Sequence, residues 1–187
     1  MPEWFLMKHL DISLTIDQEN IISNSFDSIN QNILAQPQCF VHRDFHSRNI
    51  MLIEGEKPGI IDYQDAVLGP CTYDLVSLLR DCYIEWPEER IDVLLQYYLL
   101  HTKLDLTIEF ETFKRWFDFM GLQRHIKVLG IFARLNHRDN KPNYLNDLPL
   151  TLKYFLNVAR RYPELSDLCE LFDELNIQSR INSNTQR

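Results

Sequence analysis

Three polar side chains, Asp44, Asn49 and Asp62, stand in an order that suits phosphate chemistry. Asp62 comes after two short hydrophobic runs, Ile50–Ile53 and Ile60–Ile61. In this order the first carboxylate can accept a proton from a hydroxyl group, and the amide and second carboxylate can hold Mg²⁺ against a nucleotide's phosphates. The pattern therefore predicts a phosphoryl-transfer site, with Asp44 as base and Asn49 and Asp62 as metal ligands.

These residues resemble the H-R-D-x-x-x-x-N loop of protein-kinase-like enzymes, with Asp62 at the place of the Asp in D-F-G. Two segments, His42–Asn49 and Ile61–Ala66, are more similar to aminoglycoside phosphotransferases and choline kinases. The motifs of that branch read H-x-D-x-x-x-x-N and I-D-[FYW]-x-x-A. Leu68–Leu75 resembles the next block of the branch, a Gly-Pro followed by Tyr-Asp-Leu.

Within this branch, His42–Asn49 and Gln123–Arg134 look most like the bacterial anomeric amino-sugar kinases, which phosphorylate N-acetylmuramate and N-acetylglucosamine at C1 in cell-wall recycling. The resemblance extends from about Trp4 to about Tyr162. It implies a protein-kinase-like C-terminal lobe, ATP and Mg²⁺ as cofactors, and a small sugar as substrate.

The resemblance also implies roles for residues around the three central ones. It makes His42 and Asp74 structural supports of the catalytic loop, with Asp74 accepting hydrogen bonds from the loop backbone. The residues it implies for substrate binding are His46, Arg124, His125 and Arg134. Simpler roles compete: His46 can brace the loop, Asp65 can either cap a segment or add charge near the metal, and the three residues after position 120 can form a solvated basic stripe.

Composition narrows the class of protein. A chain of 187 residues that is 45% hydrophobic can fold around one substantial core. A net charge of −8 argues against a nucleic-acid partner held by phosphate neutralisation. The four cysteines form no C-x-x-C pair, and no apolar stretch reaches the roughly 18 residues of a membrane span. We expect a cytoplasmic protein with reduced thiols and no membrane or nucleic-acid partner.

The glycines limit the part of a kinase that this chain can form. All five, Gly55, Gly59, Gly69, Gly121 and Gly130, follow Asp44. Kinases of this type cover the nucleotide with a Gly-rich loop and a strand Lys that precede the catalytic loop, and here only Lys8 precedes Asp44. The sequence predicts a C-terminal lobe without its N-terminal lobe, inactive alone unless that lobe is supplied in trans.

Hydrophobic periodicity predicts a mainly helical fold with one small β-hairpin. The hairpin joins Ile50–Ile53 to Pro58–Ile61 and would bring Asn49 beside Asp62. A helix capped by Asp17 is expected to run to Ala35, and Pro37 follows it. The other helical segments expected are Glu3–Leu10, Tyr73–Tyr83, Pro87–Leu100, Thr107–Leu135, Leu148–Arg160 and Pro163–Leu175. One lobe would cover residues 1–176, and residues 177–187 would form a disordered tail.

Three hypotheses about function remain open at this stage. The first is the C-terminal lobe of an ATP-dependent sugar kinase. The second is another small-molecule kinase of the same branch, acting on an aminoglycoside, choline or homoserine. The third is a non-catalytic fragment or binding module, favoured for the isolated chain by the missing Gly-rich loop.

Overall fold

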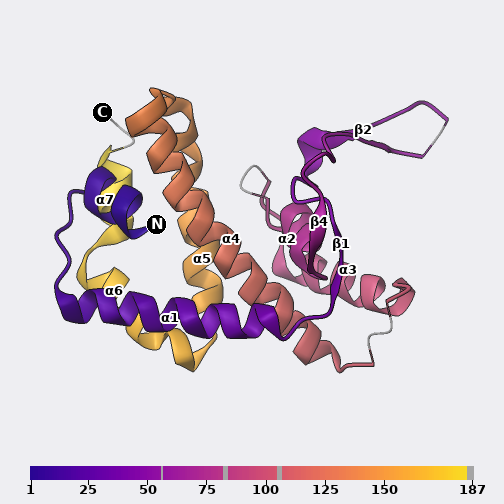
Figure 1. Ribbon diagram of the computed structural model, residues 1–187, viewed down its shortest axis with the longest axis horizontal. Coiled ribbons are helices and arrows are strands. Elements are labelled where there is room, and N and C mark those ends of the chain that lie inside the picture. Colours follow the sequence, from indigo (N-terminus) through magenta and orange to yellow (C-terminus); the bar gives the residue numbers. More distant parts are fainter. Residues whose placement is uncertain (56, 82–83, 105–106, 185–187) are drawn as a thin grey trace. The chain divides into compact units, whose positions relative to one another are not determined.

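The computed structural model describes residues 1–55, 57–81, 84–104 and 107–184, and it is mostly helical with two small antiparallel sheets (Figure 1). The described chain forms two compact units. We call Met1–Gln31 with Leu122–Arg187 the terminal unit and Asn32–Gly121 the central unit. The predicted class, mainly α with a small hairpin, is confirmed in outline, and a second two-stranded sheet is added to it.

The elements follow one another in a simple order. They are the π-helix η1 (Pro2–His9), α1 (Ile16–Leu34), β1 (Gln38–Val41), the 3-10 turn η2 (Ser47–Asn49), β2 (Ile50–Met51), β3 (Gly59–Ile60), β4 (Val67–Pro70), α2 (Tyr73–Leu79), α3 (Glu88–His101), α4 (Phe110–Asp139), η3 (Pro142–Asp147), α5 (Leu148–Ala159), η4 (Pro163–Leu165), α6 (Ser166–Glu174) and α7 (Ile177–Asn184). No helix among the described residues is long and apolar enough to cross a membrane.

The start of α1 corrects the predicted cap. The backbone N–H of Gln18 donates to Thr15 Oγ1 at 3.3 Å, and the N–H of Thr15 donates to Gln18 Oε1 at 3.0 Å. This reciprocal pair is a capping box, which satisfies two N–H groups that a helix start leaves without partners. Thr15, and not Asp17, is therefore the N-cap residue.

The core of the terminal unit is built around α5. This helix buries most of its length, including Leu148, Leu152 and Phe155, and the Phe155 ring lies 5.4 Å from that of Phe172 on α6. Burying such side chains contributes roughly 1.5–3 kcal/mol each. The unit therefore depends on apolar packing between helices.

The predicted disordered tail is wrong for residues 177–184, which form α7. Ile177 and Ile181 are buried, and α7 packs against α5 and α6. Arg180 donates to the carbonyl oxygens of Leu175 at 3.0 Å and Leu10 at 3.2 Å. Polar composition suggested disorder, but two isoleucines four positions apart are enough to seat this short helix. Residues 185–187 lie outside the described residues.

The central unit contains both sheets. The predicted hairpin is present but shorter: β2 and β3 pair with Ile50 opposite Ile60 and Met51 opposite Gly59, and the hairpin projects from the rest of its unit (Figure 1). β1 pairs with β4, from Gln38 opposite Pro70 to Val41 opposite Val67. The strand β4 was not predicted, because its Gly69-Pro70 pair is typical of a turn.

The helix after β4 ends earlier than predicted, at Leu79 and not at Tyr83. Arg80 leaves the helical conformation, and its buried guanidinium donates to Asp118 at 2.7 Å and to Glu88 at 3.2 Å. A buried guanidinium needs such partners because an unpaired charge in the interior is costly. Cys82 and Tyr83, the predicted end of this helix, lie outside the described residues.

Candidate active site

Asn49 joins the two predicted motifs directly. Its Nδ2 donates to the Asp44 carbonyl oxygen at 2.9 Å and to Asp62 Oδ2 at 3.4 Å. The short turn η2 carries Asn49 to the start of β2, and Asp62 follows β3 on the paired strand. The structure thus brings Asp44, Asn49 and Asp62 together in the central unit.

The peptide group of Ile61 holds this arrangement from both sides. Its N–H donates to the Asn49 carbonyl oxygen at 3.1 Å, and its carbonyl oxygen accepts a hydrogen bond from His42 Nε2 at 3.0 Å. These two bonds tie the segment before Asp62 to both ends of the His42–Asn49 loop. The position of the Asp62 backbone is therefore set by the loop that carries Asp44.

Asp74 fastens the other side of the loop. Its two carboxylate oxygens accept the backbone N–H groups of His42 at 2.7 Å and Arg43 at 3.1 Å. Arg43 has a φ of 75°, a left-handed conformation that costs a non-glycine residue about 1–2 kcal/mol. Charge-assisted hydrogen bonds to Asp74 offset part of that cost.

Asp62 is also held in a left-handed conformation, with a φ of 68°. Its Oδ1 accepts a hydrogen bond of 2.6 Å from Gln64 Nε2, while Oδ2 faces Asn49. Gln64 was not predicted as a site residue. It stands at a position of the I-D-[FYW]-x-x-A motif where any residue is accepted, so its type carries no signal. Strained residues concentrate at functional sites, so the two at this loop support a functional role.

The Asp44 side chain is exposed, and within the described residues its carboxylate has no hydrogen-bond or ion-pair partner. Its backbone, in contrast, is held firmly: the carbonyl oxygen accepts bonds from the His46 N–H at 3.1 Å and from Asn49. A fixed backbone with an open carboxylate suits a group that receives a proton from a bound hydroxyl.

The oxygen atoms of Asn49 and Asp62 suit Mg²⁺, and they are too few for a metal whose ligands all come from the protein. The Asn49 nitrogen is used in hydrogen bonding, so its Oδ1 and the Asp62 carboxylate are the oxygens on offer. Among the described residues no group of three or more His, Cys, Asp or Glu side chains could hold a metal ion. Mg²⁺ commonly takes one or two protein oxygens and completes its shell with waters and phosphates.

The two histidines of the loop, His42 and His46, differ in burial and in their contacts. The His42 ring is buried, lies 6.0 Å from the Phe45 ring, and donates through Nε2, so it braces the loop from below. His46 is half-buried and is the N-cap residue of η2, and the next residue, Ser47, donates to Asp81 at 3.4 Å. His42 thus has the geometry of a support, and His46 lies between Asp44 and Asn49 in the chain.

The residues predicted to line the sugar pocket belong to the other unit. Arg124 and Arg134 are half-buried on α4, and His125 is buried, with its ring stacked on Tyr154 at 5.4 Å. The alternative of a solvated basic stripe is therefore wrong for His125. These three residues belong to the terminal unit, whereas Asp44, Asn49 and Asp62 belong to the central unit.

Trp86, Trp116 and Tyr144 are aromatic residues of the kind that can stack on a sugar ring, and the rings of Trp86 and Tyr144 contact protein groups. The Trp86 ring lies under the guanidinium of Arg90 at 4.5 Å, and the Tyr144 ring lies 5.2 Å from that of Phe132. Trp116 is half-buried and its carbonyl oxygen accepts a bond from Gln36. The Trp86 and Tyr144 rings therefore have packing partners within their own units.

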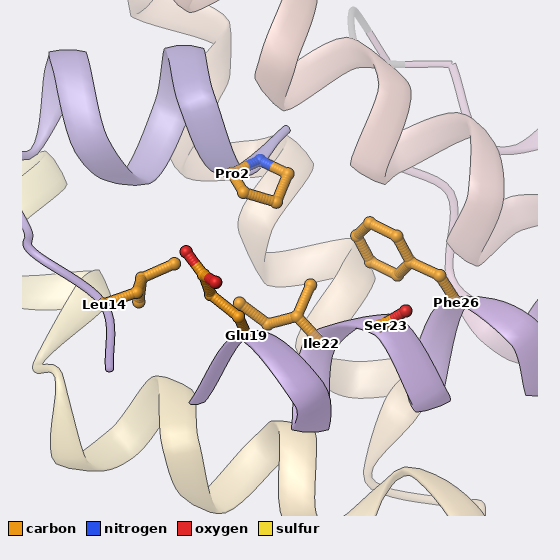
Figure 2. Close-up of a pocket in the computed structure, with 6 residues that line it drawn as sticks. All are labelled: Pro2, Leu14, Glu19, Ile22, Ser23 and Phe26. Atoms are coloured by element: carbon orange, nitrogen blue, oxygen red, sulfur yellow. The ribbon is translucent and has the colours of Figure 1, made fainter. Parts of the chain in front are cut away.

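The terminal unit also contains a pocket of about 310 Å³ between η1 and α1 (Figure 2). Its walls are mainly apolar, with the Glu19 carboxylate and the Ser23 hydroxyl as polar groups; the lining residues are Pro2, Leu14, Glu19, Ile22, Ser23 and Phe26. None of the predicted site residues lines this pocket. The pocket is therefore not part of the predicted phosphoryl-transfer site.

Comparison with known proteins assigns the class. The profile of the phosphotransferase enzyme family matches residues 2–108, which include the whole Asp44–Asp62 site. The chain belongs to this family. The predicted resemblance to phosphotransferases is thereby confirmed.

Individual relatives narrow the resemblance further. An N-acetylmuramate/N-acetylglucosamine kinase of Neisseria meningitidis serogroup B is 48% identical over 177 residues, which are 93% of this chain and 53% of the relative. The kinases of the same name from Pseudomonas aeruginosa and Pseudomonas putida are 42% and 41% identical, over 93% and 96% of this chain and 52% and 53% of their own. The chain thus spans about half the length of these relatives.

Proposed function

We propose that the chain provides the catalytic loop and metal ligands of an ATP-dependent sugar kinase. The reaction would transfer the γ-phosphoryl group to the C1 hydroxyl of N-acetylmuramate or N-acetylglucosamine. The observation that carries the proposal is the hydrogen-bonded link from Asn49 to both Asp44 and Asp62. The names of the relatives support the choice of acceptor.

In this proposal Asp44 orients the sugar hydroxyl and accepts its proton as the phosphoryl group is transferred. Asn49 Oδ1 and the Asp62 carboxylate would hold Mg²⁺, which would supply positive charge to neutralise the phosphates. Gln64 keeps the Asp62 carboxylate in one orientation through its bond of 2.6 Å. His42 and Asp74 hold the loop backbone in place.

The acceptor proposal rests on charge. Aminoglycosides are polycations, whereas the α4 segment implied for substrate binding carries Arg124, His125 and Arg134. Those groups suit a neutral or carboxylate-bearing sugar, because an arginine can pair with a carboxylate through two parallel hydrogen bonds. The lactate carboxylate of N-acetylmuramate provides such a partner, and His46 is proposed as a further contact.

We assign cover of the nucleotide to a part of the enzyme outside these 187 residues, since no glycine precedes Asp44. The 187 residues alone are therefore expected to turn over ATP negligibly. The test is an assay of this chain alone and of a fusion to the unmatched half of the Neisseria relative. Turnover by the chain alone near ~1 s⁻¹, the low end for kinases, would contradict this assignment.

We propose a cytoplasmic location for the enzyme.

The roles of the two aspartates can be separated on the fusion enzyme. Asp44→Ala should lower kcat by about 10²–10⁴-fold and leave Mg²⁺-nucleotide affinity nearly unchanged, because it removes only a base. Asp62→Ala should weaken Mg²⁺-nucleotide binding in calorimetric titration. Equal loss of nucleotide affinity in both variants would overturn the assignment.

Acceptor competition distinguishes the sugar kinase from the other small-molecule kinases. The fusion enzyme should prefer N-acetylmuramate to kanamycin, choline and homoserine in kcat/KM, and Arg124→Ala with Arg134→Ala should reduce that preference. Comparable kcat/KM for kanamycin would favour the second hypothesis. A fusion that binds these ligands without turnover would favour a binding module.

A further inference from the structure

The helix α3 is apolar on two sides. Its inner side buries Ile91 and Leu95 completely. Its outer side exposes Val93, Tyr97 and Leu100 by 64%, 62% and 81%, with Leu94 beside them. We call these four residues the outer face of α3. Exposed apolar groups that gather in one place mark an interaction surface more often than scattered ones do.

The spacing of the outer face suits packing against another helix. Val93, Tyr97 and Leu100 are separated by four and then three positions, the repeat that forms the contact seam between packed helices. The His101 ring stacks on Tyr97 at 4.1 Å and widens the apolar strip. The strip covers about two turns, so its natural partner is a short helix with a similar strip.

The charges of α3 favour a second copy of the same helix. The first turn carries Glu88 and Glu89, the last turn carries His101, and Lys103 follows the C-cap residue Thr102. Glu88 already pairs with Arg80, so Glu89 is the acidic residue considered for pairing with a basic group of another chain. Two α3 helices packed antiparallel would place the acidic start of each beside the basic end of the other, with their dipoles opposed.

We propose that the outer face of α3 is a self-association surface for a second copy of this chain, related by a two-fold axis near Tyr97. Such a contact is self-complementary, as a two-fold interface requires. Four side chains per copy bury less than the ~1,200–2,000 Å² of a stable interface, so the dimer is weak and concentration-dependent. This association is additional to the proposed phosphoryl transfer and does not depend on it.

Sedimentation velocity of the chain from about 5 to about 500 µM tests the proposal, because a weak dimer forms across that range. Leu100→Asp should weaken dimerisation by about tenfold or more, equivalent to about 1.4 kcal/mol. The matched control is Leu34→Asp, since Leu34 is 80% exposed on α1, and it should leave the dimer intact. A monomer at all concentrations, or equal loss in both variants, would overturn the proposal.

A charge exchange tests the antiparallel geometry separately. Glu89→Lys and Lys103→Glu should each weaken self-association. A mixture of the two single variants should recover it, because both acid–base pairs are restored in the mixed dimer. The double variant should recover it as well, since in an antiparallel dimer each copy then presents a basic start to the acidic end of the other. No recovery in the double variant would overturn the proposed orientation. The fusion enzyme supplies the last comparison: if it stays monomeric at concentrations where the chain alone dimerises, the added segment covers the outer face, and self-association of the longer enzyme through this face is rejected.

Discussion

Left-handed backbone occurs at described non-glycine residues in both units, but the two units use it differently. In the terminal unit it occurs at Asp11, Asn140 and Asn176, which follow the ends of η1, α4 and α6. Aspartate and asparagine adopt this conformation easily, and it commonly ends helices. In the central unit it occurs at Arg43 and Asp62, on either side of the candidate site.

The difference concerns what offsets the strain. The helix ends use residue types that accept the conformation and bonds to near neighbours, such as Asn176 N–H to the Asp173 carbonyl oxygen at 3.0 Å. Arg43 instead depends on Asp74, and the segment before Asp62 depends on His42. The terminal unit is therefore stabilised mainly by packing, and the candidate site mainly by hydrogen bonds between distant segments.

The largest expected effect is on the packing of the terminal unit. Phe155→Ala removes a fully buried ring and should destabilise this unit by about 3–5 kcal/mol, because a cavity is left behind. Hydrogen exchange should show the loss of protection in α5, α6 and α7. The control is Phe40→Ala in the central unit, where the ring is 67% exposed and the cost should be below ~0.5 kcal/mol. Similar losses in both variants would contradict a packing-dominated terminal unit.

The next effect tests the hydrogen-bonded loop. Asp74→Ala leaves the N–H groups of His42 and Arg43 without their acceptor and should cost about 1–3 kcal/mol in the central unit. Exchange of these two amides should accelerate while α5 keeps its protection. Asp74→Asn, which keeps one acceptor oxygen, should lie between the wild type and the alanine variant. Unchanged exchange at both amides would show that the strain is held by other contacts.

A pH effect of intermediate size is expected at Cys71, a buried residue that directly follows β4. Burial, and to a lesser degree the neighbouring Cys39, raises the pKa of the Cys71 thiol to about 11. The pKa of the thiol is higher in the folded state than in the unfolded state, so the buried, protonated thiol contributes to the free energy of unfolding. This contribution is complete below the unfolded pKa and is lost as pH rises toward 11. Stability should fall by about 1–2 kcal/mol between pH ~8 and ~10.5. Urea unfolding of Cys71→Ala should show a smaller alkaline loss, and an equal loss would exclude the thiol as its source.

The smallest effect concerns the helix ends. Asn176→Gly should be neutral or slightly stabilising, because glycine adopts positive φ without a steric cost. Asn176→Ala should destabilise by about 0.5–1 kcal/mol or slightly more, since alanine does not adopt that conformation readily. Thermal unfolding of the pair is sufficient to measure the difference. A more stable alanine variant would contradict the assignment of Asn176 as the residue that ends α6.

The sequence predicted those features that depend on local patterns. The hairpin and the meeting of Asn49 with Asp62 were predicted because polar motif residues flank two short hydrophobic runs. The N-cap was wrong although Thr15 and Gln18 carry a recognisable signal, since Asp17 is also a favourable cap residue. Residue type alone therefore could not decide whether Thr15 or Asp17 caps the helix.

Features set by distant partners could not be predicted. The strand β4 exists because it pairs with β1, far back in the chain, and its own residues suggest a turn. The early end of α2 follows from the Arg80–Asp118 ion pair, and α7 is ordered because two isoleucines find space in the terminal unit. The bond from Gln64 to Asp62 depends on a side-chain orientation that the motif does not specify.

The Ile61 peptide has a consequence for how the chain folds. Its bond to His42 closes a loop of 19 residues, and those of Asp74 close loops of 31 and 32. Contacts between such distant positions form late, because loop closure costs entropy before any bond repays it. Helices can assemble before these bonds exist, but Asp62 cannot take its place until they do. If Asp62 is the metal ligand proposed above, a partly folded species with helices but without these bonds would have no metal affinity, and the onset of Mn²⁺ binding during refolding would time the final step.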